Sequence, residues 1–194
     1  MTELPIPAAG LPPDWTDKVF LALDFETTGL DSRLERVVEI GAIRFSPASP
    51  GRESAFASLV DPEKAMPRAA QDIHGLSDGD LAGAPRFASL APALLELGRG
   101  SIYVAHNAGF DFAFLRVELE RSGQSALLGS PPVLDTRLLA KAAFPGRRSY
   151  RLVDLAADFG LDPGSSHRAL DDARTCMELF LLCARRLASR AGAA

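Results

Sequence analysis

The stretch Val19–Gly29, VFLALDFETTG, places two acids at the end of an apolar run. Residues Val19–Asp24 form a short run of this kind, which is typical of a buried strand. Asp24 and Glu26 are two residues apart, and on a strand such residues point to the same face. Because Thr27–Gly29 follow at once, we expect the pair at the exit of the strand into a loop. One strand end can therefore direct two carboxylates to a single point.

The pattern around this stretch predicts a mixed α/β domain. Two further strands are expected over Arg36–Phe45 and Glu53–Val60, with a Ser, Pro and Gly turn between them, so the first three strands read as an antiparallel meander. Strands and helices then alternate, which indicates an α/β fold with a mixed sheet of about five strands. The later elements are expected as strands over Ser101–Ala105 and Val133–Asp135 and as helices over Pro85–Leu97, Phe110–Arg121, Thr136–Phe144, Arg151–Phe159 and Ala169–Leu187.

Bulk composition favours one globular domain over residues 18–188, with tails at 1–17 and 189–194. The chain has 194 residues, 47% of them hydrophobic, and a net charge of −4. The totals show no basic stripe, which argues against a protein that binds long duplexes but not against one that grips a strand end through metal ions. Cys176 and Cys183 are expected as small buried residues. The Pro-rich N-terminal segment resembles neither a signal peptide nor a membrane span, so we expect a cytoplasmic location without a membrane partner.

A third acid, Asp111, follows a predicted strand directly. It falls in the first turn of the helix expected over Phe110–Arg121, where the helix dipole alone favours an acid. Capping is therefore one explanation. However, Phe110, Phe112 and Phe114 surround it, which is an apolar setting for an acid that only caps.

The fourth acid lies in the last helix, where Asp171 and Asp172 are both candidates. At 100° per residue, Asp171 falls beside Thr175 and Glu178. We therefore expect Asp172 to face the interior and Asp171 to be a surface charge. The inward face contains, within about 80° of Asp172, the residues Cys176, Leu179, Phe180, Cys183 and Leu187.

The acids together indicate a cation site. An unpaired carboxylate is expensive to bury, and a divalent cation removes that expense. Carboxylates gathered around hard cations are what metal-assisted phosphoryl chemistry needs. Among the three histidines, His106 is expected to be a structural hydrogen-bonding group. His167 follows a Gly/Ser-rich loop close to Asp172, and a histidine can accept a proton from water near neutral pH.

Three segments resemble the motifs of one family. Asp24–Gly29, His106–Leu115 and His167–Ala173 are similar, in order and spacing, to the three exonuclease motifs of the DnaQ-like DEDDh 3′→5′ exonucleases, a group with proofreading subunits, RNase T and oligoribonuclease among its members. The match covers Val19–Leu187. Shorter segments also resemble the family: Ile73–Leu76, Leu134–Thr136 and Phe144–Gly146.

This resemblance implies an RNase H-like fold and a catalytic site. It implies two divalent cations, Mg²⁺ or Mn²⁺, held by four acids, with His167 as general base and a nucleoside 5′-monophosphate as product. Thr27 would meet the 3′-terminal nucleotide, and Phe25 and Leu30 would wedge or stack against terminal bases. His74 and Asn107 are further substrate-side expectations. The implied metal ligands are Asp24, Glu26, Asp111 and Asp172.

Three functions remain open from the sequence. The first is a 3′→5′ exonuclease on single-stranded DNA ends, favoured by the Asn-Ala-Gly-Phe-Asp form of the second motif. The second is an exoribonuclease of the RNase T or oligoribonuclease type, which a contact to a 2′-hydroxyl would distinguish. The third is a non-catalytic nucleic-acid-binding or polymerase-scaffold module. A DNA polymerase partner and a monomeric or homodimeric state are likewise left open.

Overall fold

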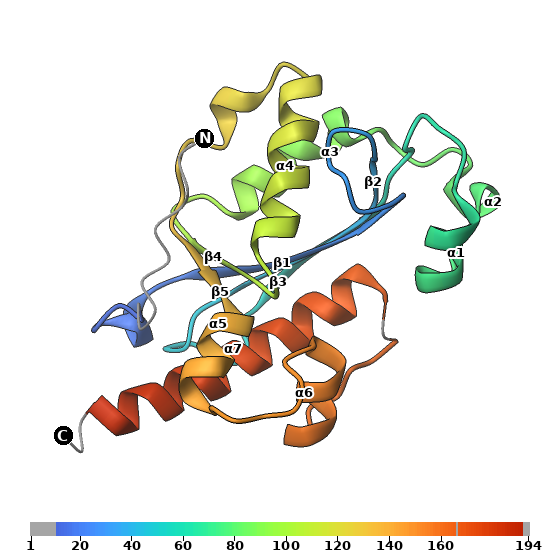
Figure 1. The fold of residues 1–194 in the computed structure, drawn as a ribbon. Helices are drawn as coiled ribbons and strands as arrows, with labels where there is room; N and C mark the ends of the chain where they lie inside the picture. Colours follow the sequence, from blue (N-terminus) through green and yellow to red (C-terminus); the bar gives the residue numbers. More distant parts are fainter. Residues whose placement is uncertain (1–10, 166, 192–194) are drawn as a thin grey trace.

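A computed structural model describes residues 11–165 and 167–191 and places a five-stranded sheet at the centre of the domain (Figure 1). The strand order is β3-β2-β1-β4-β5. The first three strands are antiparallel neighbours, whereas β4 and β5 run parallel to β1, as a meander followed by α/β units requires. The strands are β1 (Phe20–Thr27), β2 (Val37–Phe45), β3 (Ser54–Leu59), β4 (Ile102–Ala105) and β5 (Val133–Asp135).

Helices cover both faces of the sheet. One face carries α3 and α4, and the other carries α5, α6 and the long α7 (Figure 1). The remaining short helices lie in the connections. The helices are α1 (Arg68–His74), α2 (Asp78–Leu81), α3 (Phe87–Leu97), α4 (Gly109–Arg121), α5 (Thr136–Ala143), α6 (Leu152–Phe159) and α7 (Ala169–Ala191), with 3₁₀ turns at η1 (Trp15–Asp17) and η2 (Ser125–Leu127).

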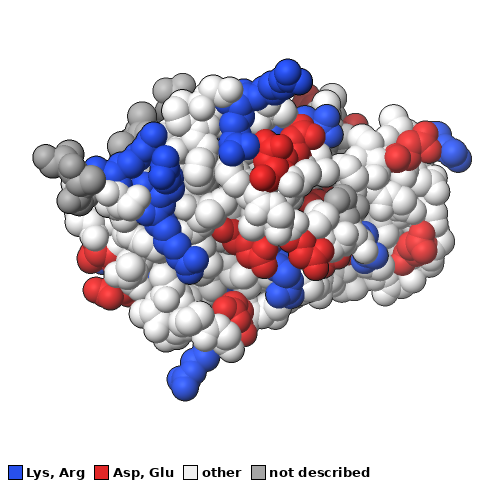
Figure 2. Space-filling model, turned by 90° about the horizontal axis from the view of Figure 1, so that it is seen from below, with Lys and Arg blue, Asp and Glu red and all other residues white. Residues whose placement is uncertain are grey.

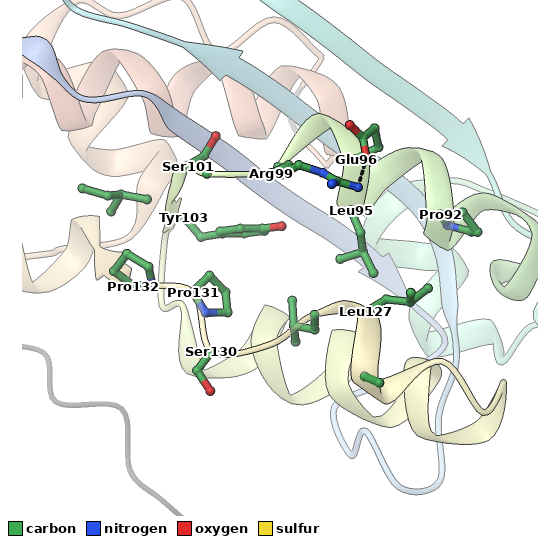
Figure 3. A pocket seen from close by; sticks show the side chains of 15 residues that line it. Pro92, Leu95, Glu96, Arg99, Ser101, Tyr103, Leu127, Ser130, Pro131 and Pro132 are labelled. Carbon is green, nitrogen blue, oxygen red and sulfur yellow. Dashed lines mark hydrogen bonds and ion pairs between the residues drawn. The ribbon is translucent and has the colours of Figure 1, made fainter.

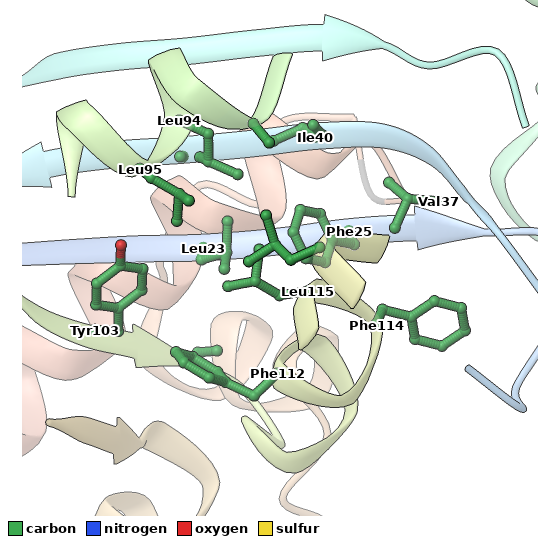
Figure 4. Close-up of a cluster of buried hydrophobic side chains, with 14 of the residues drawn as sticks. Leu23, Phe25, Val37, Ile40, Leu94, Leu95, Tyr103, Phe112, Phe114 and Leu115 are labelled. Carbon is green, nitrogen blue, oxygen red and sulfur yellow. The ribbon is translucent and has the colours of Figure 1, made fainter. Parts of the chain in front are cut away.

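The central strand β1 divides the core in two. Leu21, Leu23 and Phe25 point to the α3–α4 side, where they pack in the cluster shown in Figure 4. Phe20 and Ala22 belong to the opposite cluster, which is built on α5 and α7. Because side chains alternate along a strand, Asp24 and Glu26 continue the second set and lie on the side of α7.

The termini of the described chain correct two expected boundaries. Trp15, within the segment expected to be a loose tail over 1–17, is 8% exposed and packs edge-on against Phe180, with ring centroids 6.3 Å apart. The indole anchors this turn to α7, so it belongs to the domain; residues 1–10 lie outside the described residues. At the other end α7 continues to Ala191, so the expected tail at 189–194 begins as helix.

The two cysteines are buried and free, as expected for small core residues. In the described part of the chain, no helix combines the length and the apolar character needed to cross a membrane.

Candidate active site

A pocket of about 250 Å³ opens where β1 and β4 end. In open α/β sheets, ligands bind outside the carboxyl ends of the strands, where neighbouring connections diverge. Here β4 pairs with β1 over Phe20–Ala22 and then turns away at Ala105, which leaves the far half of β1 open on that side. The pocket is lined by the four predicted acids and His167, together with Phe25, His106, Phe110, Arg151, Leu152 and Val153.

A larger cavity, of about 760 Å³, lies at the opposite end of the parallel strands (Figure 3). Tyr103, Leu127 and Pro131 line it, and its charged groups, Glu96 and Arg99, pair with each other. It holds no group of three or more potential metal ligands, since the one such group found among the described residues lies in the smaller pocket. The chemistry of the chain therefore belongs to the smaller pocket.

Strand β1 supplies the first two acids from within the strand. We expected Asp24 and Glu26 at the exit into a loop, but β2 continues to pair with β1 as far as Thr27, and the register shifts between Glu26 and Thr27. Asp24 is half-buried, and Glu26 is 9% exposed. The extended pairing holds both carboxylates on rigid backbone.

Asp111 reaches the same pocket from the first turn of α4. It is 3% exposed, and its Oδ1 accepts a hydrogen bond from the backbone N–H of Phe25 at 3.2 Å. This bond uses an N–H on the open edge of β1. Asp111 therefore ties the start of α4 to the strand that carries the other two acids, rather than only capping its own helix.

The last helix contributes Asp172 and the loop before it contributes His167. The backbone N–H of His167 donates to Asp172 Oδ2 at 3.0 Å, and His167 has a left-handed backbone with φ of 64°. One ligand atom from each of Glu26, His167 and Asp172 can be chosen so that all three lie within 4.8 Å of one another. That spacing suits a single cation between them.

Asp171 makes structural contacts that its position on the helix did not predict. Its Oδ2 accepts the Ser165 N–H at 2.9 Å, and its carboxyl packs against Gly164. The residue is half-buried, and its helical neighbour Thr175 is buried, so the expectation of a plain surface charge was wrong. The choice of Asp172 as the acid that faces the pocket agrees with the structure.

Burial, and after it the repulsion between neighbouring carboxylates, raises the pKa values of the four acids. Burial first, and then the neighbouring acids, raise the pKa of Asp24 well above its ordinary range. Burial followed by the charges of Asp172 and Glu39 raises the pKa of Glu26 to about 8. Burial likewise raises the pKa of Asp111 to about 8, against the lowering effect of the backbone hydrogen bonds to its carboxylate. The pKa of Asp172 is raised, again mainly by burial. The pocket thus holds more negative charge than it can stabilise alone.

One acid beside the site went unnoticed in the sequence. Glu39 is the cross-strand partner of Glu26 and is 5% exposed. It accepts a forked pair of hydrogen bonds from Arg168, at 2.8 to 3.2 Å, and one from the Ala169 N–H. The signal was available, since an acid in the apolar run Val37–Ile40 poses the same burial cost as Asp24.

A glycine lets α7 approach the sheet at this point. A Cβ on Gly41 would lie 2.1 Å from the backbone carbonyl of Ala169, so a larger residue would displace the start of the helix. Together with the Glu39–Arg168 pair, this contact fixes where α7 begins. The position of Asp172 above β1 and β2 follows from it.

Three of the five expected substrate contacts, Phe25, Thr27 and Leu30, lie in or directly after the first motif, and they differ in their exposure. The Phe25 ring is 4% exposed and packs against Phe87, so it is not free to stack on a base, and that expectation was wrong. Alternation along β1 turns it into the core. Thr27 is buried and its hydroxyl donates to Gly29 O at 2.7 Å. Leu30 is 84% exposed in the turn beyond β1.

The other two expected contacts, like Thr27 and Leu30 and unlike Phe25, lie outside the residues that line the pocket. His74 is buried at the end of α1, where its Nδ1 accepts the Leu76 N–H and its Nε2 has no partner among the described residues. Asn107 is exposed and adopts a left-handed backbone with φ of 69°.

His106 has the expected structural role. Its two ring nitrogens lie 2.9 Å from Thr136 Oγ1 and 2.9 Å from the Tyr150 carbonyl. A carbonyl accepts only, so Nε2 carries the proton, and burial lowers the pKa of the ring. The ring therefore joins the end of β4 to the segment before α6, although it borders the pocket.

The donor set fits divalent cations. Four carboxylates converge with no lysine among the pocket residues, while Arg151, which lines the pocket, pairs with Asp154 and Arg168 pairs with Glu39. Oxygen donors suit Mg²⁺ and Mn²⁺. A cation would offset both the burial of these carboxylates and their mutual repulsion, which together raise their pKa values.

Comparisons with known proteins identify the family of the chain. The family model RNase_T, described as an exonuclease, matches residues 21–180. The chain is 41% identical over 174 residues to DNA polymerase III subunit epsilon of Treponema pallidum, covering 86% of this chain and 79% of that protein. It is 36% identical over 165 residues to DNA polymerase III PolC-type of Thermotoga maritima, covering 85% of this chain and 12% of that protein.

A solved structure shares the fold. The E. coli exonuclease I structure in complex with a dT13 oligonucleotide aligns with a TM-score of 0.76 at 20% identity, covering 88% of this chain and 42% of that chain. This likeness confirms the RNase H-like α/β fold. Since the family match spans well over half of the sequence, the chain belongs to the RNase_T family of exonucleases, and its assignment to the DnaQ-like 3′→5′ exonucleases is confirmed.

Proposed function

We propose that the chain removes nucleotides from the 3′ end of single-stranded DNA and releases nucleoside 5′-monophosphates. The observation that carries this proposal is the convergence of Asp24, Glu26, Asp111, His167 and Asp172 on one pocket at the open end of the sheet. The similarity to a DNA polymerase III epsilon subunit supports DNA over RNA as substrate.

In this proposal the four acids hold two divalent cations, Mg²⁺ or Mn²⁺. When bound, such ions supply Lewis-acid stabilisation of charge on the phosphate and on the leaving oxygen. The protein contributes rigidity: β1 fixes Asp24 and Glu26, the Phe25 N–H fixes Asp111, and the start of α7 fixes Asp172. Preorganised charge of this kind is worth more than charge that must be gathered during the reaction.

His167 is the proposed general base. Its imidazole is exposed at the rim of the pocket beside Glu26 and Asp172, where it can accept a proton from water. The water oxygen then bonds to phosphorus, and the bond from phosphorus to the 3′-oxygen of the preceding nucleotide breaks. The new phosphate group leaves with the terminal nucleotide.

In this proposal the terminal nucleotide binds against apolar side chains. Leu30 and Ile73 are large exposed hydrophobic residues on the β1–β2 turn and on α1. Thr27 is the last residue of β1 and His74 the last residue of α1, and burial lowers the pKa of the His74 ring against the raising effect of the Thr27 backbone. Asn107 would act from the start of α4. Association with a DNA polymerase and a cytoplasmic location belong to the same proposal.

A substrate panel tests the proposal directly. Single-stranded DNA, RNA of the same sequence and a primer with a mispaired 3′ end, each labelled at the 5′ end, are incubated with Mg²⁺ or Mn²⁺. We expect a ladder that shortens from the 3′ end of the DNA, with release of monophosphates and no reaction in EDTA. Faster digestion of RNA would replace DNA by RNA as the substrate, and the absence of any cation-dependent digestion would refute the proposal.

Replacement of His167 by Ala tests the general base. We expect kcat to fall by about 10²- to 10⁴-fold, because general-base catalysis contributes about that much. The affinity for Mn²⁺, measured by titration calorimetry, should change far less. A large loss of Mn²⁺ affinity would instead make the imidazole a metal ligand, which the spacing of Glu26, His167 and Asp172 would also permit.

A further inference from the structure

Cationic side chains that lack an acidic partner are concentrated in one region of the molecule. Elsewhere in the described chain most of the cations form ion pairs, as Arg36, Lys64, Arg121 and Arg168 do. Figure 2, which looks onto the α5–α7 side, shows several Lys and Arg side chains next to one another. The cations of this region that pair with no acid in residues 11–165 and 167–191 are Arg137, Lys141, Arg148, Arg174, Arg185, Arg186 and Arg190.

Part of this group surrounds two aromatic rings. Lys141 Nζ lies 5.9 Å from the centroid of the Tyr150 ring, and the Arg186 guanidinium lies 6.0 Å from that of Phe144. Arg190 donates to the Ala142 carbonyl at 3.1 Å, which holds the end of α7 against α5. We call Lys141, Phe144, Tyr150, Arg186 and Arg190 the α5–α7 basic surface.

This surface adjoins the catalytic pocket. The Tyr150 carbonyl accepts the hydrogen bond from His106, and the next residue, Arg151, lines the pocket with His106. Along α7, Arg186 is 14 residues beyond Asp172, which is about 21 Å at the helical rise per residue. A stacked single strand covers that distance in about six nucleotides, at 3.4 Å each.

We propose that the α5–α7 basic surface binds the phosphate backbone of the single strand on the 5′ side of the scissile bond. This inference rests on the proposed function. Uncompensated cations interleaved with aromatic rings are the features with which proteins hold single strands without reading their sequence. The protein carries a net charge of −4, so the local excess of cations is not a general property of its surface. The strand would leave the pocket past Arg151 and follow α7.

The test compares two double variants that remove the same charge. Lys141→Gln with Arg186→Gln removes two cations of the surface. Arg52→Gln with Arg116→Gln removes two exposed cations, on the β2–β3 turn and on α4, that pair with no acid in the part of the chain that the structure describes. The substrates are a 12-nucleotide oligodeoxythymidylate and the p-nitrophenyl ester of thymidine 5′-monophosphate, which is too short to reach the α5–α7 basic surface. Binding of the 12-mer is also measured by fluorescence anisotropy in EDTA.

We expect the first double variant to raise KM for the 12-mer about 10-fold at low salt and to lower its salt dependence by about 1.4 in log–log slope, at 0.7 per phosphate contact. Turnover of the nitrophenyl ester should not change, and the control variant should match the unmodified protein on both substrates. Equal binding of the 12-mer by both variants would overturn the inference, and would leave the surface to an acidic protein partner. Cation-dependent cleavage by the unmodified protein tests the proposed function separately, because the anisotropy measurement needs no cleavage.

Discussion

We expect replacement of Asp172 by Asn to lower kcat/KM on single-stranded DNA by about 10³-fold or more. Loss of a residue that only orients a metal ligand lowers metal affinity or activity 10- to 100-fold, and loss of a ligand itself lowers activity more. Asn keeps the shape of the side chain and its acceptor oxygen, so His167 N–H retains a partner in place of Asp172 Oδ2. The expected loss therefore comes from the missing charge. Single-turnover rates at saturating Mn²⁺ are the measurement.

Asp171→Asn is the matched control for this substitution. The two acids are adjacent on α7, but Asp171 holds Ser165 in the loop before the helix and does not line the pocket. We expect a loss of tenfold or less, because Asn can still accept that hydrogen bond. Equal losses in the two variants would show that the charge of Asp172 has no special role, and would undo the assignment of the fourth ligand.

The spacing of apolar residues along the sequence predicted most of the fold. Every strand and each helix of eight residues or more began and ended within a few residues of its predicted position, and most of them present an apolar face, although β3 buries none of its residues completely. The short helices α1 and α2 were missed. They span seven and four residues and bury few side chains, so they carry no helical period that a sequence pattern could reveal.

Each acid of the site could be predicted only from the residues that neighbour it in the sequence. Asp24, Glu26 and Asp111 sit in apolar runs, and their cost of burial is visible in the sequence. What brought them together was not visible. The bond from Phe25 N–H to Asp111 joins residues 86 apart, and the approach of α7 to Gly41 depends on packing across the sheet. Alternation along β1 accounts for the burial of the Phe25 ring. The expectation of a substrate contact was based instead on the place of Phe25 in the first motif.

Glu26→Gln is expected to abolish activity and at the same time to stabilise the metal-free protein. The pKa of Glu26 is raised from 4.5 to about 8 in the fold. Such a group contributes stability while it is protonated, and that stability is lost as the pH rises from about 4.5 through about 8. At pH 8 a shift of this size corresponds to on the order of 4 kcal/mol at 1.36 kcal/mol per pKa unit. Gln removes the penalty because it cannot ionise.

The stabilisation should therefore depend on pH. In EDTA at pH 8 we expect the Tm of Glu26→Gln to exceed that of the unmodified protein by about 10 °C, and the difference should shrink strongly at pH 5. Divalent cations should raise the Tm of the unmodified protein at pH 8 much more than that of the variant, since they bind the ionised carboxylate. Glu178→Gln, on α7 outside the pocket, provides the control. If Glu26→Gln lowered the Tm at pH 8 in EDTA, the burial of an ionised Glu26 beside Asp172 and Glu39 would not destabilise the fold, and the case for a site completed by cations would lose its electrostatic basis.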